Sequence, residues 1–163
     1  MDDFSVPAGF GKVWERVTAV CENEEVPLTR NQELEMFIAR EKGSIDFYKL
    51  MMNSGYFRDK QQTLCRILSD ERRHLKNLQM EYFMDTGDTL AEPQADYTEN
   101  SRDALGMLRE AYLAESESAR LYAAAAMGRT GDLGELYTAN SSDESTHAGI
   151  LKGMVEKCFA EEM

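Results

Sequence analysis

Apolar residues recur every three to four positions along four long segments of the chain, and none of the four shows sustained alternation with a period of two. A spacing of about 3.6 residues is typical of helices that bury one face. We therefore predict an all-α protein. Its four helices are expected at about Thr29–Asn53, Asp59–Met84, Ser101–Gly128 and Asp132–Ala160.

Local signals mark several ends of these segments. Thr29 is followed three residues later by Gln32, a capping-box pattern that predicts the start of the first helix. Within residues 9–24 five apolar side chains share one face, which predicts a possible short helix before the four long ones. We divide the chain into an N-terminal extension, residues 1–28, and one helical bundle, residues 29–163.

The longest connection predicted by the sequence separates the second helix from the third. It is the polar stretch DTGDTLAEPQADYTEN, which begins at Asp85 and is broken by Pro93. The other two connections are short. Short connections on either side of one long connection are typical of a four-helix bundle with a single crossover between its second and third helices.

Charge and cysteine content exclude several classes of protein. The 163 residues include 18 Lys and Arg against 30 Asp and Glu, a formal net charge of −12, and no basic patch is present. Binding to nucleic acid or to an anionic membrane surface is therefore disfavoured. No apolar run is long enough to span a membrane, and residues 1–10 lack the basic start and apolar core of a signal peptide, so we expect a cytoplasmic protein.

The three cysteines, Cys21, Cys65 and Cys158, lie far apart and form no CxxC pair. A zinc ribbon, a rubredoxin-type iron site and a disulfide scaffold are therefore poorly supported. We expect Cys65, on the second helix, to be a small buried apolar residue.

Each of the two histidines follows a glutamate by three residues. Glu71 and His74 lie in the string SDERRH, and Glu144 and His147 lie in SDESTH. Residues three apart share one face of a helix, so each pair can direct both side chains at one ion.

Two further glutamates, Glu41 and Glu115, interrupt the apolar stripes of the first and third helices. A carboxylate that faces a core is costly unless it is protonated, paired or bound to a metal. The sequence thus predicts one acid from each of four helices, with a histidine on two of them.

An internal repeat relates these positions. Glu41, Ser44 and Tyr48 recur 74 positions later as Glu115, Ser118 and Tyr122, and the Ser-Asp-Glu-x-x-His string that contains Asp70 recurs 73 positions later with Asp143. Packing alone preserves apolar periodicity but not polar identities. We infer a site on a pseudo-twofold axis between two helical hairpins.

The chemistry of the six residues predicts a dinuclear metal site. Four glutamates and two neutral imidazoles carry a charge of −4, which two divalent ions neutralise. Oxygen-rich ligation with one imidazole per ion suits Fe(II) or Mn(II), and Zn(II) is possible. The predicted ligands are Glu41, Glu71, His74, Glu115, Glu144 and His147.

On these residues the chain resembles the ferritin-like di-iron carboxylate superfamily and, within it, the rubrerythrin-like family. The strings that carry the resemblance are EKGSIDFY from Glu41, DERRH from Asp70, ESESARLY from Glu115 and DESTH from Asp143, within residues 29–160. The resemblance implies a ferritin-like four-helix bundle that holds two iron ions through the six residues, with Glu71 and Glu144 bridging the ions.

The resemblance also implies roles for residues beside the ligands. Tyr48 and Tyr122 would lie against the terminal glutamates. Asp70 and Asp143 would each hold the ring N–H of the histidine on the other hairpin.

The chain departs from rubrerythrins proper in two respects. They carry a further carboxylate where this chain has Ser118, and a rubredoxin-like iron domain that three scattered cysteines do not supply. We expect Ser44 and Ser118 to leave room for water or an oxidant above the metals. Electrons would come from a separate donor, such as a rubredoxin-like protein.

The function that the resemblance implies is an oxidoreductase that reduces peroxide or dioxygen with electrons from that donor, as a homodimer. Three alternatives stay open. They are ferroxidase chemistry that feeds iron storage, hydroxylation of a substrate, and a non-catalytic helical module for metal binding or protein interaction. The acidic charge disfavours a tRNA-modifying hydroxylase.

Overall fold

The computed structural model of the protein describes residues 27–90 and 103–161, and these residues are helical apart from short turns and helix ends. The all-α prediction is confirmed for this part of the chain. The short helix predicted over residues 9–24 lies outside the described residues. The described elements are α2 (Arg30–Asn53), a 3-10 turn η1 (Arg58–Lys60), α3 (Gln61–Thr86), α4 (Ala104–Ala126) and α5 (Asp132–Glu161).

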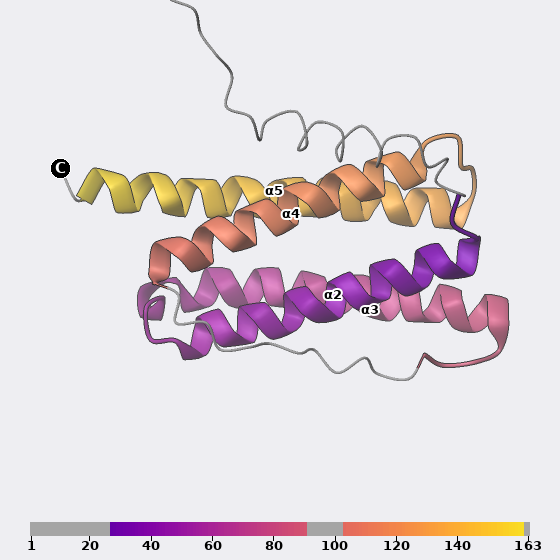
Figure 1. The fold of residues 1–163 in the computed structure, drawn as a ribbon, viewed down its shortest axis with the longest axis horizontal. Coiled ribbons are helices and arrows are strands. Elements are labelled where there is room, and N and C mark those ends of the chain that lie inside the picture. The colour runs from indigo at the N-terminus through magenta and orange to yellow at the C-terminus, as the bar shows by residue number, and fades with distance from the viewer. Residues whose placement is uncertain (1–26, 91–102, 162–163) are drawn as a thin grey trace, which may run out of the picture.

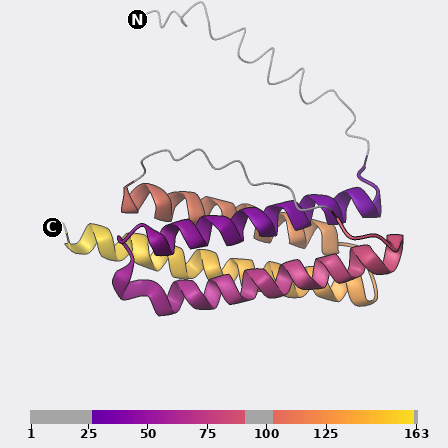
Figure 2. The ribbon, with the colours of Figure 1, turned by 90° about the horizontal axis from the view of Figure 1, so that it is seen from below.

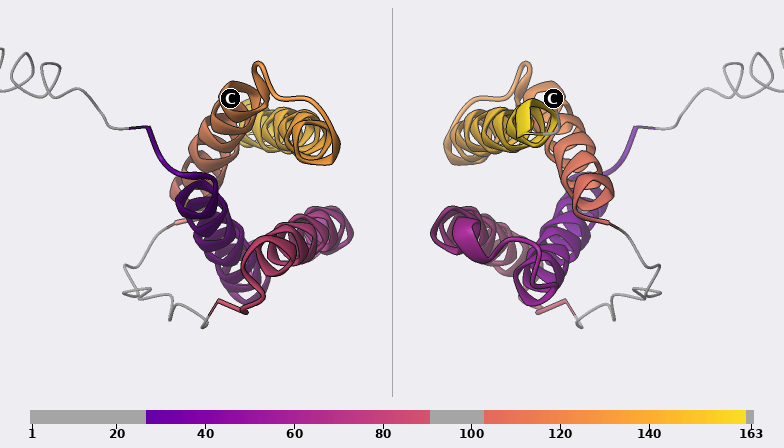
Figure 3. Two further views of the ribbon diagram at one scale, coloured as in Figure 1. Left: turned by 90° about the vertical axis from the view of Figure 1, so that its right-hand side faces the viewer. Right: turned by 90° about the vertical axis from the view of Figure 1, so that its left-hand side faces the viewer.

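The four long helices form one bundle of two antiparallel hairpins (Figures 1 and 2). Helices α2 and α3 make the first hairpin, and α4 and α5 make the second. The hairpins meet where α2 contacts α4 and α3 contacts α5. Viewed along its length, the bundle has one helix at each corner, with α2 diagonally opposite α5 (Figure 3).

Helix α3 ends and α4 begins at opposite ends of the bundle (Figure 1). A helix of 26 residues, as α3 is, extends about 39 Å. The residues between Thr86 and Ala104, at up to about 3.3 Å each when extended, are enough to cover that length. The long connection predicted between the second and third helices is therefore present.

Local hydrogen bonds fix the ends of the helices. The predicted capping box at Thr29 is confirmed: its hydroxyl accepts from the backbone N–H of Gln32, and its own N–H donates to the Gln32 side chain at 3.0 Å. Helix α4 begins at Ala104, three residues later than predicted, because the Asp103 side chain accepts from the Gly106 N–H at 2.7 Å. Gly87 ends α3 in the left-handed conformation, with φ of 75°.

The apolar core is divided into two clusters, one toward each end of the bundle. The first contains Phe47, Leu64, Leu108 and Leu151 among others, and the second contains Leu34, Leu78, Tyr122 and Tyr137 among others. On every helix the predicted metal-ligating residues fall between the positions that belong to the two clusters. The bundle therefore encloses a polar layer in its middle, with apolar packing on both sides.

One burial prediction is wrong. Cys65 is exposed rather than buried, because Leu64, Ile67 and Leu68 occupy the core-facing side of α3. None of the described helices has the length and apolar character needed to cross a membrane.

Candidate metal centre

The polar layer brings together side chains from all four helices. Each of these glutamate and histidine residues is at most 3% exposed, although both residue types are seldom buried to this degree. The structure places all six predicted ligands here: Glu41 from α2, Glu71 and His74 from α3, Glu115 from α4, and Glu144 and His147 from α5.

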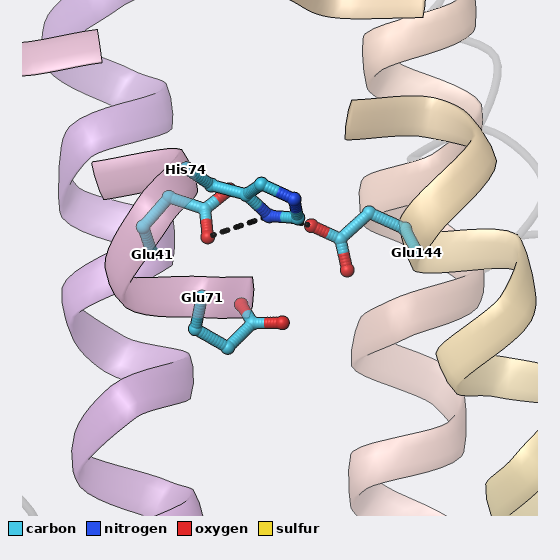
Figure 4. A group of neighbouring side chains, drawn as sticks. All are labelled: Glu41, Glu71, His74 and Glu144. Carbon is cyan, nitrogen blue, oxygen red and sulfur yellow. Dashed lines mark ion pairs between the residues drawn. The ribbon is translucent and has the colours of Figure 1, made fainter. Parts of the chain in front are cut away.

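The first of two clusters in this layer surrounds His74. Its Nδ1 lies 3.2 Å from Glu144 Oε1 and 3.7 Å from Glu41 Oε2. Figure 4 shows the side chains of Glu41, Glu71, His74 and Glu144 directed toward one another from α2, α3 and α5. One ligand atom from each of the four lies within 4.8 Å of the others, which is a spacing that one metal ion can bridge.

The second cluster surrounds His147. Its Nδ1 lies 3.0 Å from Glu71 Oε1, 3.4 Å from Glu144 Oε2 and 3.5 Å from Glu115 Oε2. These four residues also offer ligand atoms within 4.8 Å of one another. Glu71 and Glu144 belong to both clusters. Each cluster thus takes three residues from one hairpin and a fourth from the other, with two carboxylates shared between them.

Several buried polar atoms of this layer lack a hydrogen-bond partner, and their chemistry suits a metal ion. Buried polar atoms without a hydrogen-bond partner cost about 1–3 kcal/mol each, so a group of them in one place calls for a ligand. Carboxylate oxygens and imidazole nitrogens are ligands of Fe(II), Mn(II) and Zn(II). The atoms without a partner are Glu41 Oε2, Glu71 Oε1, His74 Nδ1, Glu115 Oε2, both Glu144 carboxylate oxygens and His147 Nδ1.

Both histidines are held from behind by an aspartate of the other hairpin. His74 Nε2 lies 3.1 Å from Asp143 Oδ2, and His147 Nε2 lies 3.3 Å from Asp70 Oδ2. The expected cross-hairpin contacts are therefore present. With Nε2–H donating to an aspartate, each ring keeps Nδ1 toward the centre of the layer.

Both predicted tyrosines contact the centre, again across the hairpins. The Tyr48 hydroxyl donates to Glu115 Oε1 at 2.5 Å, and the Tyr122 hydroxyl donates to Glu41 Oε1. Burial, reinforced by the neighbouring carboxylates, raises the pKa of both tyrosines well above its ordinary value, so both stay hydrogen-bond donors. Each outer glutamate thus has one oxygen held by tyrosine and the other facing the centre.

The electrostatics of the metal-free centre are those of a protonated cluster. Burial raises the pKa of Glu71 to about 10 and that of Glu115 to about 8. Burial also opposes ionisation of Glu144, but the close Glu115 carboxyl and both histidines outweigh it and hold the pKa of Glu144 well below its usual range. Burial alone would lower the pKa of His74 and His147, yet the close carboxylates of the surrounding glutamates raise these pKa values to about 11 and about 12. Binding of a cation by this layer therefore has to displace protons from Glu71, Glu115 and the two histidines.

A pocket of about 200 Å³ opens between α2 and α4. Ser44 and Ser118, each three residues after an outer glutamate, line it together with Arg40. The Arg40 guanidinium donates to Ser118 Oγ at 3.1 Å and 3.3 Å, which links the two helices across the pocket. Both serines thus line a pocket on this face, and the expected room above the metal positions stays a prediction.

Sequence reasoning missed three residues around the centre. Arg40 lines the pocket, Arg73 contacts both aspartates behind the histidines, and Asn140 is only 2% exposed, one turn before Glu144. Asn140 was visible as a polar residue in the apolar stripe of its helix. The two arginines carried no such signal, because an arginine on a charged helix is typical of a solvated surface.

Comparisons of the chain with protein-family models, with curated proteins and with solved structures each found no match. The function of the centre is therefore inferred from its own residues.

Proposed function

We propose that this chain is a ferritin-like, rubrerythrin-like dinuclear metal protein. In this proposal the centre holds two iron ions, or two ions of manganese or zinc, and the iron form reduces peroxide or dioxygen with electrons from an external donor such as a rubredoxin-like protein. The observation that carries the proposal is the pair of buried ligand clusters, which share Glu71 and Glu144 and contain the unsatisfied atoms of the polar layer.

The two clusters define which residues would hold which ion. Glu41 and His74 would serve one ion and Glu115 and His147 the other, while the shared glutamates would bridge both. Four carboxylates and two neutral imidazoles have a charge of −4, so two divalent ions leave the layer neutral. Neutrality matters here because an isolated charge is costly in a layer enclosed by apolar clusters.

A pair of ferrous ions, when bound, supplies two electrons to a small oxidant, which is chemistry that no side chain of this layer provides. The chain contributes position and shielding. Tyr48 and Tyr122 orient the outer glutamates, and the two aspartates orient the histidine rings. The apolar clusters exclude water from both ends. In this proposal a small molecule would approach from the side of α2 and α4, where Ser44 and Ser118 line a pocket.

Anaerobic titration of metal-stripped protein with Fe(II) tests the proposal. We expect two tightly bound ions per chain in the wild type, and loss of both ions in Glu71→Ala and in Glu144→Ala, because each removes a ligand shared by both clusters. Glu156→Ala removes an exposed glutamate from the same helix as Glu144 and is the matched control, expected to bind two ions. A wild-type chain that binds no ion contradicts the proposal.

The oxidation step then separates the candidate functions. Repeated consumption of peroxide or dioxygen by the Fe(II) form, sustained by an added reductant, supports the oxidoreductase. Retention of many irons per chain after oxidation supports iron storage instead. Two bound ions that are not oxidised by either reagent support a non-catalytic module.

A further inference from the structure

Arg73 joins the two halves of the centre on the face formed by α3 and α5. Its Nη1 lies 2.7 Å from Asp70 Oδ1, and its Nη2 donates to Asp143 Oδ2 at 2.8 Å. These are the two aspartates that hold His147 and His74 from behind. A single guanidinium therefore contacts the supporting carboxylate of both histidines, one from each hairpin.

The internal repeat duplicates everything in this arrangement except the arginine. Asp70, with the Glu-x-x-His pair that follows it, has a counterpart 73 positions later at Asp143, but the position that corresponds to Arg73 is Thr146. The Thr146 hydroxyl donates to the backbone carbonyl of Ser142 on its own helix, at 3.0 Å. One arginine thus serves two symmetry-related aspartates, which places it at the pseudo-twofold axis.

We propose that Arg73 is a positioning residue for both metal positions and acts through Asp70 and Asp143. This inference rests on the proposed metal centre. The planar fork of a guanidinium can bind two carboxylates in fixed directions, which a single ammonium does less well. Without the fork, both aspartates are free to turn toward solvent, since their side chains are 32% and 40% exposed.

Exposed ion pairs by themselves contribute little, and the Arg73 side chain is 53% exposed. Its contacts differ from an ordinary surface pair because each partner carboxylate also accepts from a buried ring nitrogen. On Asp143 the same oxygen, Oδ2, accepts from both Arg73 and His74. Movement of either aspartate therefore changes the orientation of a metal-facing imidazole.

A Co(II) titration of metal-free protein, followed by visible absorption and by competition with a chelator, tests this role. We expect Arg73→Gln to weaken binding of both ions by about tenfold each, the lower end of what partners of metal ligands contribute. Asp70→Asn is expected to weaken chiefly binding of the ion at His147, and Asp143→Asn chiefly binding of the ion at His74. Arg72→Gln makes the same charge change one residue away and is the matched control, expected to stay within about twofold of the wild type.

The decisive measurement repeats Arg73→Gln in the Asp70→Asn/Asp143→Asn background. If Arg73 acts through the aspartates, the substitution has no further effect there, and its influence on the Co(II) spectrum also disappears. An equal weakening in both backgrounds would show that Arg73 acts by charge alone, which overturns the proposal. A purely structural role would lower the melting temperature of metal-free protein without changing either Co(II) readout, and this result also overturns it.

Arg73→Lys guards against a variant that does not fold. It retains the positive charge but lacks the planar guanidinium fork, so we expect it to bind both ions at least about threefold more weakly than the wild type. Wild-type affinity in Arg73→Lys and Arg73→Gln together would refute the role of Arg73 while leaving the metal centre intact. A wild-type chain that binds no Co(II) would refute the centre and the positioning role together.

Discussion

Glu144 is assigned the negative charge of the metal-free centre, and replacing it by glutamine tests that assignment. The matched replacement is Glu71→Gln. Because burial raises the pKa of Glu71 to about 10, this side chain is neutral at pH 7, and glutamine is a close neutral mimic of it. Glu144 is ionised and lies between two protonated imidazoles, so the same substitution there removes a charge.

The distances set the size of the effect. Glu144 oxygens lie 3.2 Å from His74 Nδ1 and 3.4 Å from His147 Nδ1. At an effective dielectric constant of about 20, each contact corresponds to roughly 5 kcal/mol of Coulomb attraction before the cost of burial is subtracted. Removal of one partner from a buried ion pair typically costs about 3–5 kcal/mol, which we expect for Glu144→Gln. For Glu71→Gln we expect no loss of stability, because glutamine keeps a neutral hydrogen-bonding group and removes the proton uptake that folding requires of a carboxyl with a raised pKa.

Urea unfolding in the presence of a chelator, at several pH values, measures both variants. The raised pKa values of the histidines contribute stability that is fully present below about pH 6.5 and is lost as the pH rises toward about 11. The gap between wild type and Glu144→Gln is therefore expected to be large at pH 6.5 and smaller at pH 9. Equal losses in the two variants at pH 6.5, or a gap that widens with pH, would refute the assignment of charge.

Three further predictions concern the same centre. Metal ions must displace protons from Glu71, His74 and His147, whose pKa values are about 10, 11 and 12 respectively. The apparent affinity for Zn(II), measured by competition with a chelator, should therefore rise steadily between pH 6 and pH 8. An affinity that does not change with pH would contradict this. Tyr122→Phe leaves Glu41 Oε1 buried without a donor and should destabilise metal-free protein by about 1–3 kcal/mol in thermal unfolding, whereas Tyr82→Phe, at an exposed hydrogen bond, should have little effect. Ser118→Glu brings a carboxylate to the pocket between α2 and α4 and should raise the rate of oxidation of the Fe(II) form by peroxide relative to dioxygen, and an unchanged ratio of rates would count against it.

The number and order of the helices could be predicted because the information is local. Each helix carries its own apolar stripe, and the capping box at Thr29 involves residues only three apart. The ends were less accurate where several capping residues compete. Ser101 and Asp103 are both good N-caps by residue type, and the structure uses Asp103.

The candidate ligands could be predicted for a different reason: polar residues stand out within apolar stripes, and the repeat shows them twice. The roles of Arg73 and Arg40 could not be predicted, because each depends on a partner on another helix, Asp143 for Arg73 and Ser118 for Arg40, and so on which faces the hairpins present to each other. Cys65 was assigned to the wrong face because a cysteine fits either side of a helix, and only the packing of Leu64 and its neighbours decides between them.

The division of each metal cluster between the hairpins has a consequence for the order of folding. Contacts within a hairpin are close in sequence, so the two hairpins can form early and quickly. Neither cluster is complete within one hairpin, since each needs a fourth residue from the other. The ligand atoms therefore meet only when the hairpins dock, which is the last step of this order and follows the folding transition state. A metal ion added to the folding reaction would then leave the folding rate almost unchanged and slow unfolding instead, so that the lifetime of the native state depends on the metal while the speed of reaching it does not.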